Sequence, residues 1–505
     1  MWVKHFETVR GHFDSIKGLD LDIIYHNFMT KIEKTEVSAN KFSKTFTTVV
    51  CGIALLSDGY ITSSIGVTQS LLKKQYGKEV TSKSWAFSRI ASFTFLGTIL
   101  GMAMFGWISD KIGRKAGMIS ANLLLIFFTI CCAFTFSPDG SPEGLFTMFV
   151  IFRVGLGIGI GGEYPSSSVA ASESSSEVSG NYRQALFIGV TNASIDAGWA
   201  LAGFVAWILA LSFGNDLNKV ELMWRLTIGL GVIVPAATLW FRAQLVEPEA
   251  YNKNKMVKIP YMLVFKKYWL RLAGISFIWF TYDLCAYPFG LYASTITSTV
   301  LPDDHTLSDQ FFWDFVILLF YMPGAIGGAF LTNMIGPKWG LITGLTCQAV
   351  MAIVLAQGFE TLSKNIAVFS LMYGLFLSFG ELGPGDNIGL IASSSCATTV
   401  RGQFYAIAGV FGKIGAFYGT DSFTSVQKWF ETGDTEKERS ISGNKGIFML
   451  AAGLNIICVV VAYFTVIDMS QDIVAEENEE FLKYLEDNGV KPRELLSETT
   501  ADIKV

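Results

Sequence analysis

Long apolar stretches separated by short polar connections recur along almost the whole chain of 505 residues. A transmembrane helix needs about 20 predominantly apolar residues, and twelve stretches meet that requirement. The predicted spans are residues 46–70, 86–109, 117–136, 145–168, 185–213, 223–243, 270–296, 311–334, 340–358, 365–392, 403–427 and 447–467. The sequence therefore predicts an all-α polytopic membrane protein with twelve transmembrane helices.

The composition supports this prediction and argues against several other classes of protein. The chain is 51% hydrophobic and 16% charged, whereas soluble domains carry about 25% charged residues. The seven cysteines all lie in apolar stretches, without the spacing of metal ligands. We find no nucleophile–base pair and no phosphate-binding loop. We therefore expect neither an enzyme nor a nucleic-acid binder, and neither a metal site nor a cofactor.

The connections between the spans indicate how the chain is oriented in the membrane. Lys and Arg are more frequent in the N-terminal segment, the even-numbered connections and the tail than in the odd-numbered connections. Because cytoplasmic loops are enriched in these residues, we expect both termini to be cytoplasmic. The predicted parts are an N-terminal segment (1–45), a six-helix bundle (46–244), a central loop (245–268), a second six-helix bundle (269–468) and a tail (469–505) whose acidic beginning should form a short amphipathic helix.

A short basic turn occurs once in each half of the chain. The first follows the second span and contains Asp110 and Arg114, and the second follows the eighth span and contains Gly336 and Lys338. Six plus six spans with matching turns suggest parallel repeats around a central pathway. In this feature the chain resembles the major facilitator superfamily over residues 40–470. The resemblance implies two six-helix bundles, with Asp110 and Arg114 in a structural or gating role.

Several ionisable residues fall inside the predicted spans, where a charge at the helix centre costs about 2.5–3.5 kcal/mol. Such residues usually mark a transport pathway. Asp58 lies in the first span, Glu163 in the fourth, Asp283 in the seventh and Lys413 in the eleventh. Arg153, in the fourth span, is expected to tie that helix to a neighbour by charge-assisted hydrogen bonds. We expect the others to serve substrate or proton movement.

The fourth and tenth spans should be irregular helices. Pro165 lacks a backbone donor and should loosen the fourth span just after Glu163 and Tyr164. The tenth span contains Gly383-Pro-Gly-Asp-Asn387, which predicts a broken helix. Irregular backbone at membrane depth is tolerated where it lines a cavity. Both segments are therefore expected to face the transport pathway.

The seventh and eleventh spans carry the remaining candidate site. Trp279, Asp283 and Tyr287 are spaced four residues apart and therefore share one helix face. A buried lysine keeps its charge only beside an anion. Lys413 is thus expected to pair with Asp283, with Asp58 or with an anionic substrate.

Together these motifs resemble the phosphate:proton symporter family of the superfamily, over most of the chain. The matching segments are 161–165 followed by Glu173, the stripe 279–287, and Gly412-Lys413-x-Gly415 after Arg401. The resemblance implies roles for two sets of residues. The implied substrate-binding residues are Tyr164, Trp279, Asp283, Tyr287 and Lys413, and the implied proton-coupling residues are Asp58, Glu163 and Asp283.

Two departures point to a particular branch of that family. Its inorganic-phosphate members usually carry Asp where this chain has Glu163, and a Gln in the fifth span, where this chain offers Asn192, Ser194 and Asp196. The run 163–173 is more similar to the fungal glycerophosphodiester permeases, which transport glycerophosphoinositol or glycerophosphocholine. For the head group of such a substrate we expect contacts from Asn192 and Asn387, with Asp196 and Asp386 as further candidates.

The sequence thus predicts a proton-coupled symporter that imports glycerophosphodiesters through the plasma membrane by alternating access. Moving an anion against a negative-inside potential costs about 2.3 kcal/mol per charge per 100 mV, so proton co-transport is expected. An inorganic phosphate:proton symporter is the main alternative, followed by a transporter-like nutrient receptor and a sugar porter. We expect a monomer in the lipid bilayer whose other partner is a small organic phosphate.

Overall fold

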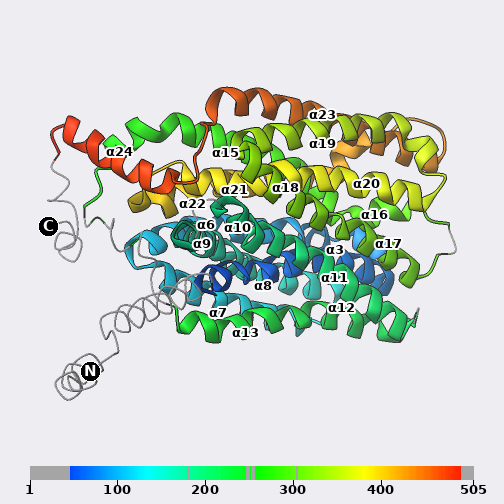
Figure 1. Ribbon diagram of the computed structural model, residues 1–505. Helices are drawn as coiled ribbons and strands as arrows, with labels where there is room; N and C mark the ends of the chain where they lie inside the picture. The colour runs from blue at the N-terminus through cyan, green and yellow to red at the C-terminus, as the bar shows by residue number, and fades with distance from the viewer. Residues whose placement is uncertain are drawn as a thin grey trace, which may run out of the picture. The chain divides into compact units, whose positions relative to one another are not determined.

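Figure 1 shows the computed structural model, which describes residues 46–178, 182–214, 216–245, 251, 256, 258–302 and 305–490. The predicted N-terminal segment, most of the central loop and the tail beyond residue 490 lie outside the described residues. The residues from Thr47 onward belong to one unit, and the description below concerns that unit.

The first half of the chain forms six helical spans. In chain order its elements are α3 (Leu55–Tyr76), α4 (Lys78–Lys83), α5 (Trp85–Arg89), α6 (Ser92–Lys111), α7 (Arg114–Ala133), α8 (Pro142–Glu163), η1 (Tyr164–Ser168), α9 (Val169–Val178), α10 (Arg183–Val190), α11 (Asn192–Phe213), η2 (Leu217–Lys219), α12 (Val220–Gly229), η3 (Leu230–Val232) and α13 (Ile233–Ala243). The fourth, fifth and sixth spans are each built from consecutive elements, such as α8, η1 and α9.

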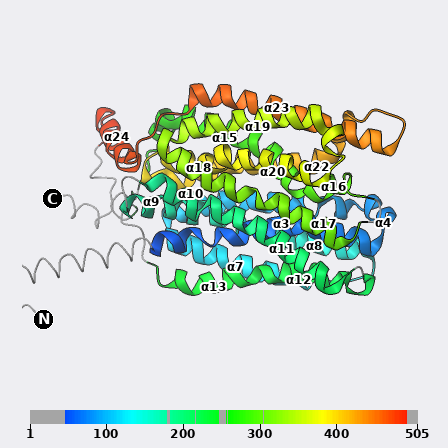
Figure 2. The same ribbon diagram turned by 45° about the vertical axis from the view of Figure 1, so that its right-hand side comes forward.

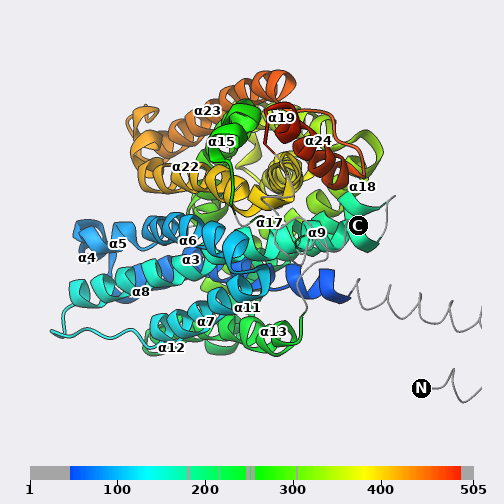
Figure 3. The same ribbon diagram turned by 90° about the vertical axis from the view of Figure 1, so that its left-hand side faces the viewer.

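The second half forms six further spans and a terminal helix. Its elements are α15 (Tyr261–Leu291), α16 (Ala293–Ser298), α17 (Leu307–Leu319), α18 (Tyr321–Ile335), α19 (Pro337–Leu362), α20 (Ile366–Gly380), η4 (Glu381–Gly385), α21 (Asp386–Ser394), η5 (Thr398–Val400), α22 (Arg401–Trp429), α23 (Glu436–Thr465) and α24 (Ile473–Asp487). Figures 1 and 2 show the long helices lying side by side along a common direction. Figure 3 looks along them and shows the helices of the two halves gathered in two groups.

Ten helices of the described part are long and apolar enough to cross a membrane. α15 and α22 have the required length, 31 and 29 residues, but they are less apolar because they carry groups such as Asp283 and Lys413. With these two included, each predicted span corresponds to a helix. The all-α fold with twelve spans in two bundles is confirmed.

Glycines let neighbouring helices pack backbone against backbone. A Cβ atom at Gly59 of α3 would lie 1.9 Å from the carbonyl oxygen of Ile195 in α11, and one at Gly157 of α8 would lie 2.1 Å from that of Thr94 in α6. No larger residue fits at either contact. Membrane helices usually associate through close approach at small residues, because the hydrophobic effect does not drive helices together within lipid.

Two π-helical segments interrupt the fourth and tenth spans at a proline. η1 contains Pro165 and η4 contains Pro384, so the irregularities predicted from the sequence are both confirmed. The two segments occupy corresponding positions in the two halves. Each has a glutamate at its start, Glu163 just before η1 and Glu381 as the first residue of η4. π-Segments often occur at functional sites.

The helix predicted for the beginning of the tail is α24, and we call the end of the unit at which it lies the α24 end (Figure 1). Phe481 of α24 packs against the ring of Tyr268 in α15, with centroids 5.9 Å apart. Glu477 forms an ion pair of 2.5 Å with Arg271. α15 begins at Tyr261, within the predicted central loop, and its first turns provide the surface on which α24 lies.

Candidate functional site

A central cavity lies between the two halves. The first half contributes η1, α10 and α11, and the second half contributes α15, α18, η4, α21 and α22. Its polar and aromatic lining residues are Tyr164, Ser168, Phe187, Thr191, Asn192, Asp196, Trp199, Trp279, Tyr282, Asp283, Tyr287, Tyr321, Glu381, Asp386, Tyr405 and Lys413. Six of the seven predicted substrate-binding residues therefore line one cavity; the exception is Asn387.

Lys413 is held by groups from both halves. Its Nζ donates to Oδ2 of Asp283 at 2.9 Å and to the hydroxyl of Tyr287 at 2.5 Å. The ammonium also lies 4.1 Å and 5.1 Å from the ring centroids of Tyr287 and Tyr164. The two phenol hydroxyls are 3.5 Å apart. Of the three partners that the sequence allowed for Lys413, the structure shows Asp283.

This arrangement can bind an anion by exchange of partners. Lys413 and Asp283 are only 2% and 3% exposed, so each charge depends on the other for compensation. An anion that contacts Lys413 can take the place of Asp283, and the hydroxyls of Tyr164 and Tyr287 are donors for its remaining oxygens. The site thus contains a cation, a displaceable carboxylate and two phenols.

Trp279 closes one side of the Lys413 environment. Its indole packs edge-to-face on Tyr405, with centroids 5.4 Å apart. On α22 it faces Gly412, where a Cβ atom would lie 2.4 Å from Cδ1 of the indole. Glycine beside Lys413 is therefore required for the indole to occupy this position.

A second polar cluster in the cavity consists of three carboxylates around the side-chain amide of Asn192. Nδ2 of Asn192 donates to Oε2 of Glu381 at 2.9 Å and to Oδ1 of Asp386 at 2.8 Å, and it lies 3.4 Å from Oδ2 of Asp196. The hydroxyl of Tyr282 donates to Oε1 of Glu381 at 3.3 Å. The sequence pointed to Asn192, Asp196 and Asp386 but assigned no role to Glu381, whose position depends on the π-segment η4.

Asn387 is turned away from this cavity. Its Oδ1 accepts from Thr332 at 2.9 Å, and its Nδ2 donates to the carbonyl of Gly383 at 2.8 Å. The side chain is fully buried between α18, α19 and the start of α21. The predicted head-group contact of Asn387 is therefore not seen, because both ends of the amide are occupied by protein groups.

Glu163 also lies outside the cavity lining, in an ion pair within the first half. Its Oε1 and Oε2 accept from Nη1 and Nη2 of Arg242 at 2.6 and 2.7 Å, and it contacts the hydroxyl of Ser167. Both side chains of the pair are fully buried. The sequence reasoning missed Arg242, although a carboxylate at mid-span should have prompted a search for a cation. The proton-coupling role of Glu163 stays a prediction.

Asp58 and Arg153 are buried in the first half of the chain. Asp58 is 1% exposed, and neither of its carboxylate oxygens has a hydrogen-bond partner among the described residues. Such a group is costly to bury as an anion, which fits its predicted part in proton movement. Nη1 of Arg153 donates to the carbonyl of Ile61 at 3.3 Å, which ties α8 to α3 in the manner expected.

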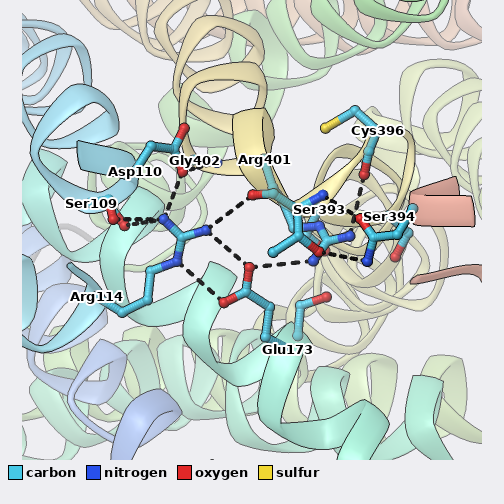
Figure 4. Close-up of polar contacts among 12 residues, drawn as sticks. Ser109, Asp110, Arg114, Glu173, Ser393, Ser394, Cys396, Arg401 and Gly402 are labelled. Atoms are coloured by element: carbon cyan, nitrogen blue, oxygen red, sulfur yellow. Dashed lines mark hydrogen bonds and ion pairs between the residues drawn. The ribbon is translucent and has the colours of Figure 1, made fainter. Parts of the chain in front are cut away.

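At the α24 end, a buried network joins the two halves (Figure 4). Asp110 of α6 accepts from the backbone amides of Gly402 and Gln403, at 3.0 and 2.8 Å, at the beginning of α22. Amides at a helix N-terminus favour a negative charge. A Cβ atom at position 402 would lie 2.6 Å from Oδ1 of Asp110, so glycine is needed for this contact.

Arg114 extends the network to a second carboxylate. It lies 2.6 Å from Asp110 and 2.9 Å from Glu173, and Glu173 in turn lies 3.3 Å from Arg401 of α22 (Figure 4). All four side chains are fully buried. From the sequence, Glu173 and Arg401 were recognised only as parts of motifs, and no contact between them was predicted. Their contacts hold the two halves together at the α24 end. The halves must separate at this end for the cavity to open there.

The comparisons with known proteins agree with this architecture. The sequence pattern of the Major Facilitator Superfamily matches residues 51–420. This chain belongs to the major facilitator superfamily. Among solved structures, the proton:xylose symporter XylE bound to 6-bromo-6-deoxy-D-glucose shares the fold with a TM-score of 0.71 at 17% identity, over 88% of this chain and 99% of that chain.

Two relatives from Candida albicans are much more similar in sequence. The glycerophosphocholine permease GIT4 is 40% identical over 448 residues, which are 88% of this chain and 82% of that protein. The major glycerophosphoinositol permease GIT3 is 37% identical over 97% of this chain and 90% of its own length. Both are named as permeases, in agreement with the expectation that this chain is not an enzyme.

Proposed function

We propose that this protein is a proton-coupled symporter that imports glycerophosphodiesters through the plasma membrane by alternating access. The observation that carries the proposal is Lys413, buried between the two halves with Asp283 as its displaceable partner and two phenols beside it. Relatives named for glycerophosphocholine and glycerophosphoinositol transport support this substrate class.

The ion pair suggests how substrate and proton are coupled. When a phosphodiester oxygen contacts Lys413, Asp283 loses its compensating charge. A buried carboxylate without a partner is strongly disfavoured, so Asp283 takes up a proton as the substrate binds. Asp58, whose carboxylate has no hydrogen-bond partner among the described residues, is a second site for a proton. Substrate and proton then cross together, because the bound anion compensates the charge of Lys413 while the proton neutralises Asp283.

Alternating access requires the contacts at the α24 end to break and re-form. We propose that this end faces the cytoplasm, in line with the distribution of Lys and Arg along the sequence. The Arg114–Glu173–Arg401 contacts close the cavity on that side while substrate enters from the other. Rocking of the halves then opens the α24 end and releases substrate and proton.

The cavity also supports two simpler statements about the assembly. Both halves of the chain line the cavity, and we propose that the protein works as a monomer. Its coupling groups are carboxylates and a lysine, so we propose that it needs no cofactor besides the coupling proton.

Uptake of labelled substrate in a cell without its own glycerophosphodiester permease tests the proposal. Saturable uptake of glycerophosphocholine or glycerophosphoinositol is expected, with little competition from excess inorganic phosphate. Lys413→Ala should abolish it, whereas Lys445→Ala, a partly exposed lysine 3.8 Å from Glu360, should not. Undiminished saturable uptake by Lys413→Ala would remove this residue from the site, and preferential uptake of inorganic phosphate would favour the alternative function.

A further inference from the structure

The central cavity has two regions of opposite character. In the first, the ammonium of Lys413 is held by Asp283 and Tyr287. In the second, Asp196, Glu381 and Asp386 surround one neutral amide. Lys413 is the only cation in the described lining, against four carboxylates. A substrate with a single negative charge would leave the acidic region without compensation.

The glutamates beside the two π-segments have different kinds of partner. In the first half, Glu163 beside η1 is neutralised by Arg242 of the sixth span. In the second half, Glu381 of η4 has no ion pair among the described residues, and its contacts are the neutral groups of Asn192 and Tyr282. Glu163 is thus balanced by a cation inside the first half, whereas Glu381 lines the cavity and has no ion pair among the described residues.

An unsatisfied carboxylate oxygen strengthens this observation. Asp386 is 1% exposed, and its Oδ2 has no hydrogen-bond partner among the described residues, while Oδ1 accepts from Asn192. A buried carboxylate in this condition calls for a compensating cation or a proton. The described residues contain no group of His, Cys, Asp and Glu arranged to hold a metal ion.

Aromatic rings line the same part of the cavity. Trp199 and Tyr321 lie with ring centroids 5.7 Å apart, and Trp199 lies 6.3 Å from Tyr287. Tyr282, which donates to Glu381, is adjacent in sequence to Asp283, so one turn of α15 connects the two regions. Aromatic faces together with negative charge recognise quaternary ammonium groups, which cannot donate hydrogen bonds.

We propose that Asp196, Glu381 and Asp386, with the faces of Trp199 and Tyr321, form a subsite for the cationic head group of a zwitterionic glycerophosphodiester. The inference rests on the proposed function and narrows its substrate class to diesters that carry a quaternary ammonium, such as glycerophosphocholine. The phosphodiester binds at Lys413 and the ammonium binds at the acidic region, so each end of the substrate meets the opposite charge. Glycerophosphoinositol, whose head group is neutral, gains nothing from this subsite.

The test compares the uptake efficiency, Vmax/KM, for glycerophosphocholine with that for glycerophosphoinositol in the full-length protein. Wild type should favour glycerophosphocholine at least tenfold. Glu381→Gln, Asp386→Asn and Asp196→Asn should each lower this ratio at least tenfold by raising the KM for glycerophosphocholine alone. Asp314→Asn is the matched control, because Asp314 of the second half is a buried carboxylate that does not line the cavity. It is 3% exposed and has no hydrogen-bond partner among the described residues.

A second measurement needs no variant and therefore does not depend on folding. Free choline should inhibit uptake of labelled glycerophosphocholine by wild type, and inositol at the same concentration should not. Absence of a wild-type preference, absence of choline inhibition, or equal loss of both substrates in the three variants would overturn the subsite; equal loss would assign these carboxylates to proton movement instead. If neither diester is transported at all, the proposed function itself fails.

Discussion

Replacing one partner of the ion pair between Lys413 and Asp283 should lower the stability of the protein far more than replacing both partners. The two charges are 2.9 Å apart and almost completely buried. Lys413→Met leaves the carboxylate alone in the cavity, and Asp283→Leu leaves the ammonium alone. Removal of one partner from a buried pair costs about 3–5 kcal/mol, whereas replacing both by apolar residues is often neutral or stabilising. The double variant should therefore recover most of the stability that each single variant loses.

The assay is the heating midpoint of the purified protein in detergent, followed by fluorescence-detected size exclusion. We expect both single variants to aggregate at clearly lower temperature than wild type, and the double variant to return close to it. All three variants should lack uptake, because each has lost the substrate-binding residue Lys413, the proton-accepting residue Asp283, or both. Additive losses in the double variant would show that the two residues are not energetically coupled and would refute the reasoning.

Two glycine contacts give further predictions. Gly402→Ala should weaken closure of the α24 end, because its Cβ atom would meet Asp110 at 2.6 Å; maleimide labelling of a cysteine introduced beside the network should become faster. Gly412→Ala should raise the KM for substrate at least tenfold with little loss of folded protein, because it displaces Trp279, and uptake kinetics will show this. Gly453→Ala, which has open space around its Cβ atom, should leave labelling and uptake as in wild type, and a similar change in this control would remove the steric explanation.

The sequence predicted the spans well because apolar length is a local property. It could also predict where two helices are irregular, since proline acts on its own turn. The ends of the spans were harder: residues 261–269 continue α15 beyond the predicted seventh span and carry Tyr268, which packs under α24. That contact joins segments of the chain more than 200 residues apart, so no local pattern reveals it.

Partners of buried charges depend on tertiary structure in the same way. The sequence left three partners open for Lys413, and it overlooked Arg242, which lies 79 residues from Glu163. The tenth span is apolar on most of its surface, and the π-segment changes which residues share a face. This explains why the sequence favoured Asn387 over Glu381 as a contact for the head group.

The central claim is that binding of a phosphodiester at Lys413 transfers a proton to Asp283. The most direct test is proton movement in proteoliposomes that contain the purified protein, followed by external pH when glycerophosphocholine is added. Wild type should take up protons together with substrate and make the external medium more alkaline, and Asp283→Asn should abolish this signal. Substrate uptake without proton movement, or an unchanged proton signal in Asp283→Asn, would contradict the account.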